Sequence, residues 1–227
     1  MSDSTIDPPI SRAALARHTA GVLHRGNSHN PDVLLVEVGG RQLVVKDFAP
    51  RGVFVRSTIG RWITAREVRA LRALDGLESV PRFLGSIDAL AFAVEYRPGQ
   101  HMSRRLAGRV PPEFLGRLEA ALREMHRRGV AHLDLRHRSN LLVGEDGGPI
   151  LIDFGSALTF RPGGRLARWL LPLLGRLDLA ALEKWRSRLN PSLSPPPQDS
   201  DPDRARSPHR EADGVRGGRC SGDRSRG

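Results

Sequence analysis

The feature that most constrains this chain is a pair of segments, 132–140 and 150–155, which we call the two polar segments because they carry Asp134, Asn140 and Asp153. The first reads His-Leu-Asp-Leu-Arg-His-Arg-Ser-Asn, and the second reads Ile-Leu-Ile-Asp-Phe-Gly. Two apolar runs, 140–143 and 149–152, flank a turn rich in Gly and Asp, which predicts a β-hairpin. Such a hairpin would gather Asp134, Asn140 and Asp153. One carboxylate to orient a hydroxyl, plus oxygen ligands for Mg²⁺, is the inventory that phosphoryl transfer requires.

Composition narrows the class of protein. The 227 residues suffice for one large domain or two small lobes, and the net charge is +11. Such basicity suits nucleic acid, an anionic membrane surface or a phosphorylated substrate. No apolar run is long enough to span a membrane, no secretory signal is visible, and the lone Cys220 excludes a disulfide frame. We therefore expect a soluble, cytoplasmic protein.

The first hundred residues predict a small antiparallel sheet with one inserted helix. Residues 1–18 are expected to be loose and flexible. Two β-branched runs, 33–38 and 41–48, are joined by Gly39-Gly40, which indicates a tight hairpin. Apolar residues at helical spacing predict a helix over 59–74, and a third apolar strand is expected over 90–96.

The rest of the chain predicts helices around the two polar segments. Pro112 and Gly129 mark the start and the stop of one helix. Residues 166–189 predict one or two further helices, broken near Pro172 and Gly175. From residue 191 apolar residues nearly vanish, and seven Arg mix with six acidic residues without periodicity. That composition predicts a disordered tail over 191–227.

Together these segments resemble the protein-kinase-like superfamily. The resemblance covers roughly residues 20–190 and is strongest over 130–155, and it is closest to the small bacterial lipopolysaccharide (Kdo) kinase and RIO-type branch. It implies an α+β, two-lobed fold. The N-terminal lobe, 19–97, would hold the sheet and one helix, and a reduced helical C-terminal lobe, 98–190, would hold the catalytic and metal-binding loops. ATP and Mg²⁺ would be the cofactors.

Motif positions assign roles within this resemblance. Asp134 matches the catalytic-loop Asp that orients the acceptor hydroxyl, and Asp153 matches the Mg²⁺-binding Asp of the Asp-Phe-Gly motif. Asn140 matches the second metal ligand, but it lies one residue farther from Asp134 than the family pattern has it. Either the loop carries an insertion, or Ser139 occupies the ligand position. We favour Asn140, because an amide oxygen suits a hard cation.

Lys46 matches the strand lysine that contacts the nucleotide phosphates. It is one of two lysines among 36 basic residues, and it follows the apolar run 43–45. Glu67 is its expected ion-pair partner on the inserted helix. The alternative is a capping box, in which Thr64 and Glu67 cap the start of their own helix. The ion pair requires that the helix begin earlier, near Ser57 or Thr58.

Two further contacts with the nucleotide are expected. The family usually covers the phosphates with a glycine-rich turn. Here the segment 21–28 lacks that pattern, so backbone amides near Gly26 and the hydroxyl of Ser28 are the candidates, with an ordinary loop as the equal alternative. Glu95 and Tyr96 end the strand that leads into the hinge, where the backbone would meet the adenine edge.

Two sequence features of many protein kinases are missing here, and both bear on which kind of acceptor we expect. Leu133 stands where phosphorylation-switched kinases commonly have Arg, and no Ala-Pro-Glu segment follows Gly155. A docking platform for protein substrates is therefore expected to be mostly missing. The resemblance favours a lipopolysaccharide-core sugar as acceptor, with protein Ser or Thr as the alternative. An ATP-binding pseudokinase is the rival without catalysis.

The stretch 165–176 has basic ends and an apolar centre. It would suit peripheral contact with an anionic inner-membrane surface, although such a stretch more often packs onto its own domain. A purely basic binder of nucleic acid or membrane ranks last, because no aromatic stacking platform is evident and nucleic acid is thus an improbable partner.

Overall fold

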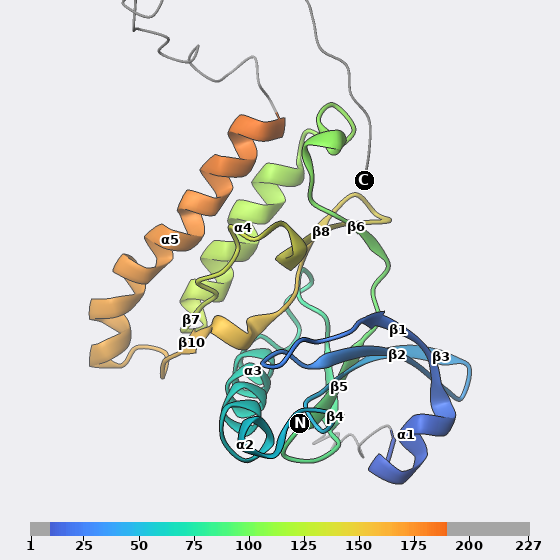
Figure 1. The fold of residues 1–227 in the computed structure, drawn as a ribbon. Helices are drawn as coiled ribbons and strands as arrows, with labels where there is room; N and C mark the ends of the chain where they lie inside the picture. The colour runs from blue at the N-terminus through green and yellow to red at the C-terminus, as the bar shows by residue number, and fades with distance from the viewer. Residues whose placement is uncertain (1–9, 190–227) are drawn as a thin grey trace, which may run out of the picture. The chain divides into compact units, whose positions relative to one another are not determined.

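The computed structural model describes residues 10–189, which belong to one compact unit. The predicted tail, 191–227, and residues 1–9 lie outside the described residues. Two lobes follow one another along the chain (Figure 1). The first is built on a sheet, and the second is built on two long helices.

A five-stranded antiparallel sheet forms the N-terminal lobe, in the order β1-β2-β3-β5-β4. The strands are β1 (Thr19–His24), β2 (Asp32–Val38), β3 (Arg41–Asp47), β4 (Phe83–Ser86) and β5 (Ala91–Glu95). Gly39 and Gly40, at φ +57° and +73°, make the two-residue turn in which Val38 pairs with Arg41. Both turn positions need left-handed backbone, which Gly adopts without strain. The hairpin therefore forms where the sequence predicts it.

Each face of this sheet carries a helix. On one face, the helix α1 (Arg12–His18) buries Leu15 with Val36, Leu43 and Val45. On the other face, the helix α3 (Arg61–Ala73) packs Val68 and Leu71 in the same core as Phe92. Side chains alternate between the two faces, so Lys46 on β3 points away from α1. The prediction of a loose segment up to residue 18 is thus wrong for residues 12–18, because Ile10 and Leu15 are buried against the sheet.

The helical segment that leads into α3 begins earlier than the sequence pattern predicts. A short α2 (Val53–Val55) and a π-helical turn, η1 (Arg56–Gly60), precede α3 without a break. Gly60 permits this, because a Cβ there would lie 3.1 Å from Phe48. Thr64 and Glu67 therefore lie inside the helical run, and the capping-box alternative is wrong.

The C-terminal lobe is built from α4 (Phe114–Arg127) and α5 (Arg165–Leu189). A small sheet in the order β6-β8-β9 joins β6 (Gly99–His101), β8 (Leu141–Gly144) and β9 (Pro149–Leu151). A second pair joins β7 (Val130–Ala131) to β10 (Leu158–Thr159). Three short 3-10 turns complete the lobe: η2 (Arg104–Leu106), η3 (Arg138–Asn140) and η4 (Phe154–Ser156). β8 and β9 are the hairpin that the sequence predicts between the two polar segments.

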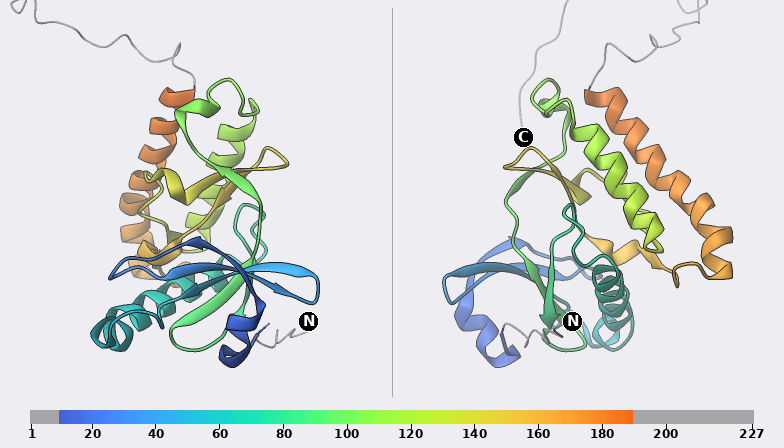
Figure 2. Two further views of the ribbon diagram at one scale, coloured as in Figure 1. Left: turned by 45° about the vertical axis from the view of Figure 1, so that its right-hand side comes forward. Right: turned by 180° about the vertical axis from the view of Figure 1, so that it is seen from behind.

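Helix α5 runs unbroken through the two positions where a break was predicted. Pro172 removes one backbone hydrogen bond, but the helix continues around it. Gly175 lets α5 approach α4 closely, because a Cβ there would lie 2.9 Å from the ring of His126. Packing against α4 holds the helix together, and the two helices lie side by side in both views of Figure 2.

Candidate active site

Lys46 links the sheet, helix α3 and the segment after β9. Its Nζ donates to Glu67 Oε1 at 2.6 Å and to Asp153 Oδ1 at 2.7 Å. The Lys46 and Glu67 side chains are 13% and 4% exposed, whereas that of Asp153 is 52% exposed. The predicted ion pair of Lys46 with Glu67 is therefore present, and a second carboxylate shares the same ammonium from the solvent side.

The two carboxylates set the charge of this cluster. Burial lowers the pKa of Lys46, but Asp153 and Glu67 outweigh it, so that the pKa of Lys46 is raised and the ammonium stays charged. The Lys46 charge holds the pKa of Asp153 below its usual value. Burial raises the pKa of Glu67, against the opposing effects of Lys46 and the Phe154 amide.

Asp153 holds an unusual backbone conformation. Its φ is +66° and its ψ +74°, in the left-handed region that L residues rarely adopt. The following Phe154 N–H donates to Glu67 Oε1 at 3.1 Å, and Phe154 is fully buried in the core. Glu67 thus fixes both the lysine and the backbone after Asp153. That turn leaves the Asp153 carboxylate half exposed at the edge of the cluster.

The loop that carries Asp134 is closed by Asn140. The Asn140 amide nitrogen donates to the backbone oxygen of Asp134 at 3.0 Å and to its Oδ2 at 2.9 Å. Ser139 Oγ donates to Asn140 Oδ1 at 2.9 Å. Asn140 is buried and donates directly to the Asp134 carboxylate, whereas the Ser139 hydroxyl donates to Asn140 instead. The loop, one residue longer than the family pattern, therefore still brings Asn140 into contact with Asp134.

His132 joins the two polar segments. Its ring lies against Phe154, with ring centroids 4.7 Å apart. Nε2 is 3.1 Å from the Ile152 carbonyl, and the Asp134 N–H points at Nδ1 over 3.4 Å. A carbonyl only accepts, so Nε2 carries the proton and Nδ1 is free to accept. Burial lowers the pKa of His132. The imidazole is thus neutral and connects the backbone of Asp134 to the residue before Asp153.

Helix α5 supplies a residue that the sequence reasoning missed. Asp178 is fully buried, and its two oxygens accept the N–H groups of His132 at 2.9 Å and of Leu133 at 2.8 Å. Leu133 has φ +68°, so this carboxylate holds a strained peptide in place. His126 also contacts Asp178, at 2.9 Å. An acidic residue on the buried face of the apolar helix pattern was the signal that could have identified it.

Helix α5 also contacts the backbone of Leu135 and Arg136, the two residues after Asp134. Lys184 Nζ donates to the Arg136 carbonyl, and Trp185 Nε1 donates to the Leu135 carbonyl at 3.4 Å. On the other side of the site, Arg66 donates to the backbone oxygens of Ser156 and Ala157, after Asp153. These contacts fix both segments by their backbones and do not engage the carboxylates of Asp134 and Asp153.

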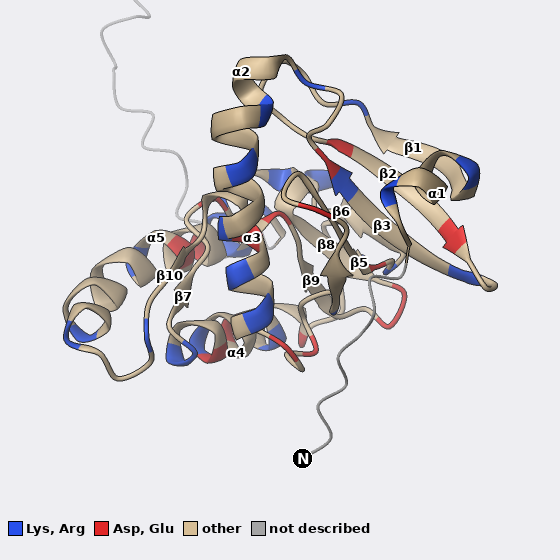
Figure 3. Ribbon diagram, turned by 90° about the horizontal axis from the view of Figure 1, so that it is seen from below, with Lys and Arg blue, Asp and Glu red and all other residues tan. Residues whose placement is uncertain are grey.

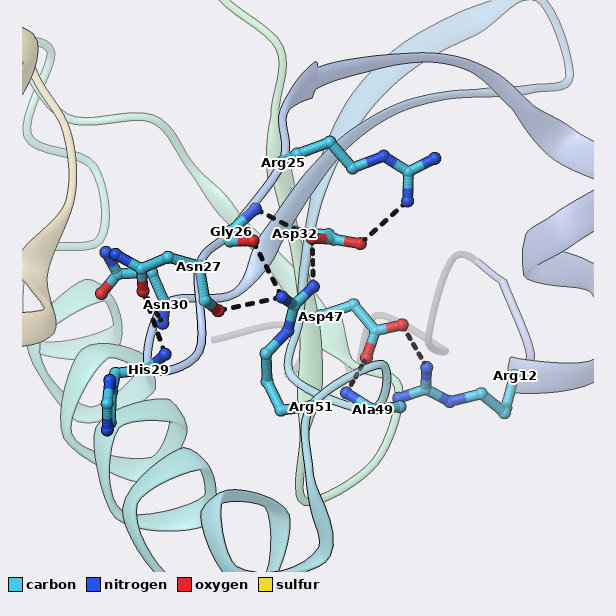
Figure 4. A network of polar contacts seen from close by, with 10 residues as sticks. All are labelled: Arg12, Arg25, Gly26, Asn27, His29, Asn30, Asp32, Asp47, Ala49 and Arg51. Carbon is cyan, nitrogen blue, oxygen red and sulfur yellow. Dashed lines mark hydrogen bonds and ion pairs between the residues drawn. The ribbon is translucent and has the colours of Figure 1, made fainter.

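A polar network fixes the turn between β1 and β2, where the glycine-rich turn was expected (Figure 4). Asp32 is buried and accepts from the Gly26 amide at 2.9 Å and from Arg51, which also donates to the carbonyls of Gly26 and Asn27. The Gly26 amide is therefore engaged inside the protein, contrary to its expected role toward phosphate. Ser28 lies exposed in the same turn.

Arg51 and Asp32 are also residues that the sequence reasoning missed. Nearby, Asp47 accepts from Arg12 at 2.5 Å and from the Ala49 amide at 2.8 Å. Arg12 in turn donates to Asp88 at 2.7 Å. The turn between β1 and β2 is thus held by Asp32, at the start of β2, and by Arg51, after β3, in place of repeated glycines.

Glu95 and Tyr96 lie at the junction between the lobes. The Glu95 N–H donates to the Arg82 carbonyl at 2.9 Å, and Glu95 Oε2 accepts from the Arg82 amide at 3.2 Å. Tyr96 follows β5, and β6 begins three residues later at Gly99. The backbone around 96–98 is therefore the direct link between the sheet and the C-terminal lobe, as expected for a hinge.

The donor set around Asp153 suits Mg²⁺. Carboxylate and amide oxygens are the ligands of hard cations, and Mg²⁺ in nucleotide sites takes one or two protein ligands beside phosphate and water. The Asp153 carboxylate is half exposed, and Asn140 Oδ1 keeps a second lone pair beside the Ser139 contact. Among residues 10–189, no cluster of three or more His, Cys, Asp or Glu side chains could hold a metal by itself.

Comparison with known proteins identifies the fold. No protein-family model and no curated protein sequence matches the chain. Among solved structures, the chain is similar to the Rio2 kinase of Chaetomium thermophilum, solved as an ADP/Mg²⁺-phosphoaspartate complex. The TM-score is 0.57 and the identity 18%, over 82% of this chain and 61% of the Rio2 chain. The two-lobed protein-kinase-like fold predicted from the sequence is therefore confirmed.

Proposed function

We propose that this protein is an ATP-dependent phosphotransferase that moves the γ-phosphoryl group of ATP to a hydroxyl. The observation that carries this proposal is the cluster in which Lys46 holds both Glu67 and Asp153. The Asp134–Asn140 pair supplies the second half, and His132 contacts the backbone of both halves. The fold shared with Rio2 kinase supports the same assignment.

Within the proposed site, some residues position the acceptor hydroxyl and others balance the negative charge of the phosphates. Asp134 would orient the acceptor hydroxyl and accept its proton, while Lys46 would meet the phosphate oxygens as a compact cation. Asp153 and Asn140 would hold Mg²⁺, whose chemistry is to neutralise charge on the phosphates. The backbone at 95–98 would receive the adenine, and the 25–31 turn would border the phosphates. Such preorganisation supplies most of the rate in reactions of this class.

For the acceptor, we favour a hydroxyl of a lipopolysaccharide-core sugar. Within residues 10–189, α4 and α5 are the only long helices of the C-terminal lobe, so little surface is offered for docking a folded protein substrate. The alternative is a protein Ser or Thr, in line with the likeness to Rio2 kinase. A sugar hydroxyl therefore suits this small C-terminal lobe better than a folded protein substrate does.

Transfer of label from γ-labelled ATP tests the proposal. The protein is incubated with Mg²⁺ and with separate glycolipid and protein fractions, beside Asp134→Asn and an exposed control, Arg41→Gln. Wild type and the control should label one fraction, and Asp134→Asn should label it at least about a hundredfold more slowly. Equal labelling by Asp134→Asn, or no labelling by wild type in any fraction, would refute the assignment.

A further inference from the structure

Helix α5 exposes a continuous apolar stripe along its first four turns. The stripe consists of Leu166, Trp169, Leu170, Leu173 and Leu177, which are between 37% and 83% exposed. At 100° per residue these positions share one face of the helix. Trp169 is the most exposed of them, at 83%. Large apolar side chains gathered on one helix face indicate a surface that binds something.

The other side of α5 is already in use. Its buried residues include Gly175 against His126, Asp178 under the 132–133 backbone, and Trp185 below Leu135. The start of α5 extends past the end of α4 in Figures 1 and 2. The stripe is therefore separate from the residues that build the active site.

Charge around the stripe has a single sign. Between residues 161 and 177 the sequence holds four Arg and no acidic residue. These are Arg161, Arg165, Arg168 and Arg176, all exposed. In the charge-coloured ribbon of Figure 3, the first turns of α5 carry blue and no red. A helix with exposed Leu and Trp on one face and flanking Arg matches an anionic lipid surface, in which headgroups meet the guanidinium groups and acyl chains meet the apolar face.

Other occupants match the stripe less well. The 38 residues after Leu189 contain only two large apolar residues, Leu193 and Val215, and so cannot cover five. A second copy of the chain would place the same Arg-rich surfaces against each other, which is electrostatically unfavourable. Among the described helices, none is long and apolar enough to cross a bilayer, so α5 would lie at the surface.

We propose that the stripe and its flanking arginines bind the surface of an anionic membrane, with α5 lying in the headgroup region. The inference does not depend on phosphotransfer, because it uses none of the active-site side chains. It places the phosphotransferase lobe at a lipid surface, with the opposite side of the same helix holding the catalytic loop.

Co-sedimentation of the full chain with vesicles tests this surface. Phosphatidylcholine vesicles are compared with vesicles that contain phosphatidylcholine and phosphatidylglycerol in equal parts. Wild type should bind the anionic vesicles at least about tenfold more tightly than the neutral ones, and added salt should weaken the binding. A Trp62→Phe background leaves Trp169 and the buried Trp185, so a blue shift of the total emission on binding would report Trp169 leaving water.

Two variants separate the stripe from general basicity. Trp169→Ser with Leu173→Ser should weaken anionic-vesicle binding by at least about tenfold with an unchanged Tm, because both side chains are exposed. Arg41→Glu with Arg69→Glu makes the same charge change elsewhere as Arg165→Glu with Arg168→Glu, and only the α5 pair should abolish binding. Wild-type binding by the Ser variant, equal loss in both Glu pairs, or self-association through the stripe without vesicle binding would overturn the proposal.

Discussion

At the scale of single residues, Lys46 is the side chain on which the site depends. It lies between the buried Glu67 and the half-exposed Asp153, so one ammonium neutralises a buried carboxylate and the carboxylate that we propose as a metal ligand. If Lys46 were lost, Glu67 would remain buried without its cation, and Asp153 would lose the charge that holds its pKa low. Stability and the proposed chemistry are therefore coupled at Lys46.

Lys46→Met tests that coupling. Removing one partner of a buried pair leaves an uncompensated charge, so we expect the free energy of unfolding to fall by about 3 kcal/mol. Glu67→Gln should also destabilise, and the double variant should lose less than the sum of the two single variants. Urea unfolding of all four proteins measures this cycle. Strict additivity would show that the pair contributes no coupling.

His132 gives the protein a dependence on mildly acidic pH. Its pKa is lowered in the folded state by burial, so below about pH 6.5 the unfolded chain binds a proton that the folded chain excludes. Stability is therefore full above that pH and is lost as the pH falls, by up to about 1.4 kcal/mol per pH unit.

The comparison of unfolding free energies at pH 7.5 and 5.5, for wild type and His132→Asn, isolates this histidine from the other seven. The variant should show the shallower loss, whatever its absolute stability. An identical pH slope in both proteins would mean that His132 does not exclude the proton.

The residues whose spacing defines the two polar segments could be read from the sequence. Lys46 and Glu67 form the ion pair that the sequence predicts. Asp134, Asn140 and Asp153 were chosen by motif position, and the structure adds the contacts of Asp153 with Lys46 and of Asn140 with Asp134. Asp32, Arg51 and Asp178 could not be read in this way. Their partners are backbone groups and side chains brought near by folding, which no local motif records. Only Asp178 leaves a signal in the sequence, as an acidic residue on the buried face of an apolar helix pattern.

At the scale of elements, the turn between β1 and β2 is held by charged side chains at the place where we expected a glycine-rich turn. Gly26 is the one glycine there that the packing requires, since a Cβ would lie 2.1 Å from the Asn30 carbonyl oxygen and 2.4 Å from that of Pro31. Both neighbours are backbone atoms, which cannot yield cheaply. The residues at which helices begin were the hardest feature to predict. Helix α1 is amphipathic over only two turns, and α2 runs directly into a π-helical turn.

Gly26→Ala should destabilise the protein by about 1–3 kcal/mol, since the added methyl group forces backbone atoms apart. Gly21→Ala is the matched control. It lies in β1 of the same lobe with nothing within 4 Å of an added Cβ, and it should stay within about 0.5 kcal/mol of wild type. Chemical denaturation reports both. A Gly26→Ala protein as stable as Gly21→Ala would show that the turn is not packed as described.

At the scale of the molecule, the site is assembled from both lobes. β3 and α3 supply Lys46 and Glu67, and the C-terminal lobe supplies Asp134, Asn140 and Asp153. The two-lobed fold was predictable, because the hairpins and the α4 stop at Gly129 are encoded locally. The continuous course of α5 was not, because Pro172 signals a break that packing against α4 overrides.

The most direct test of this account is calorimetric titration of ATP, with Mg²⁺ and with a chelator, into wild type, Asp153→Asn and Asp134→Asn. We expect wild type to bind ATP at least about tenfold more tightly with Mg²⁺. Asp153→Asn should lose that Mg²⁺ dependence, while Asp134→Asn should keep it, because the role proposed for Asp134 is toward the acceptor and not toward the metal. ATP affinity that is the same with and without Mg²⁺ in wild type, or an Mg²⁺ dependence retained in Asp153→Asn, would contradict the assignment of this cluster as a phosphotransfer site.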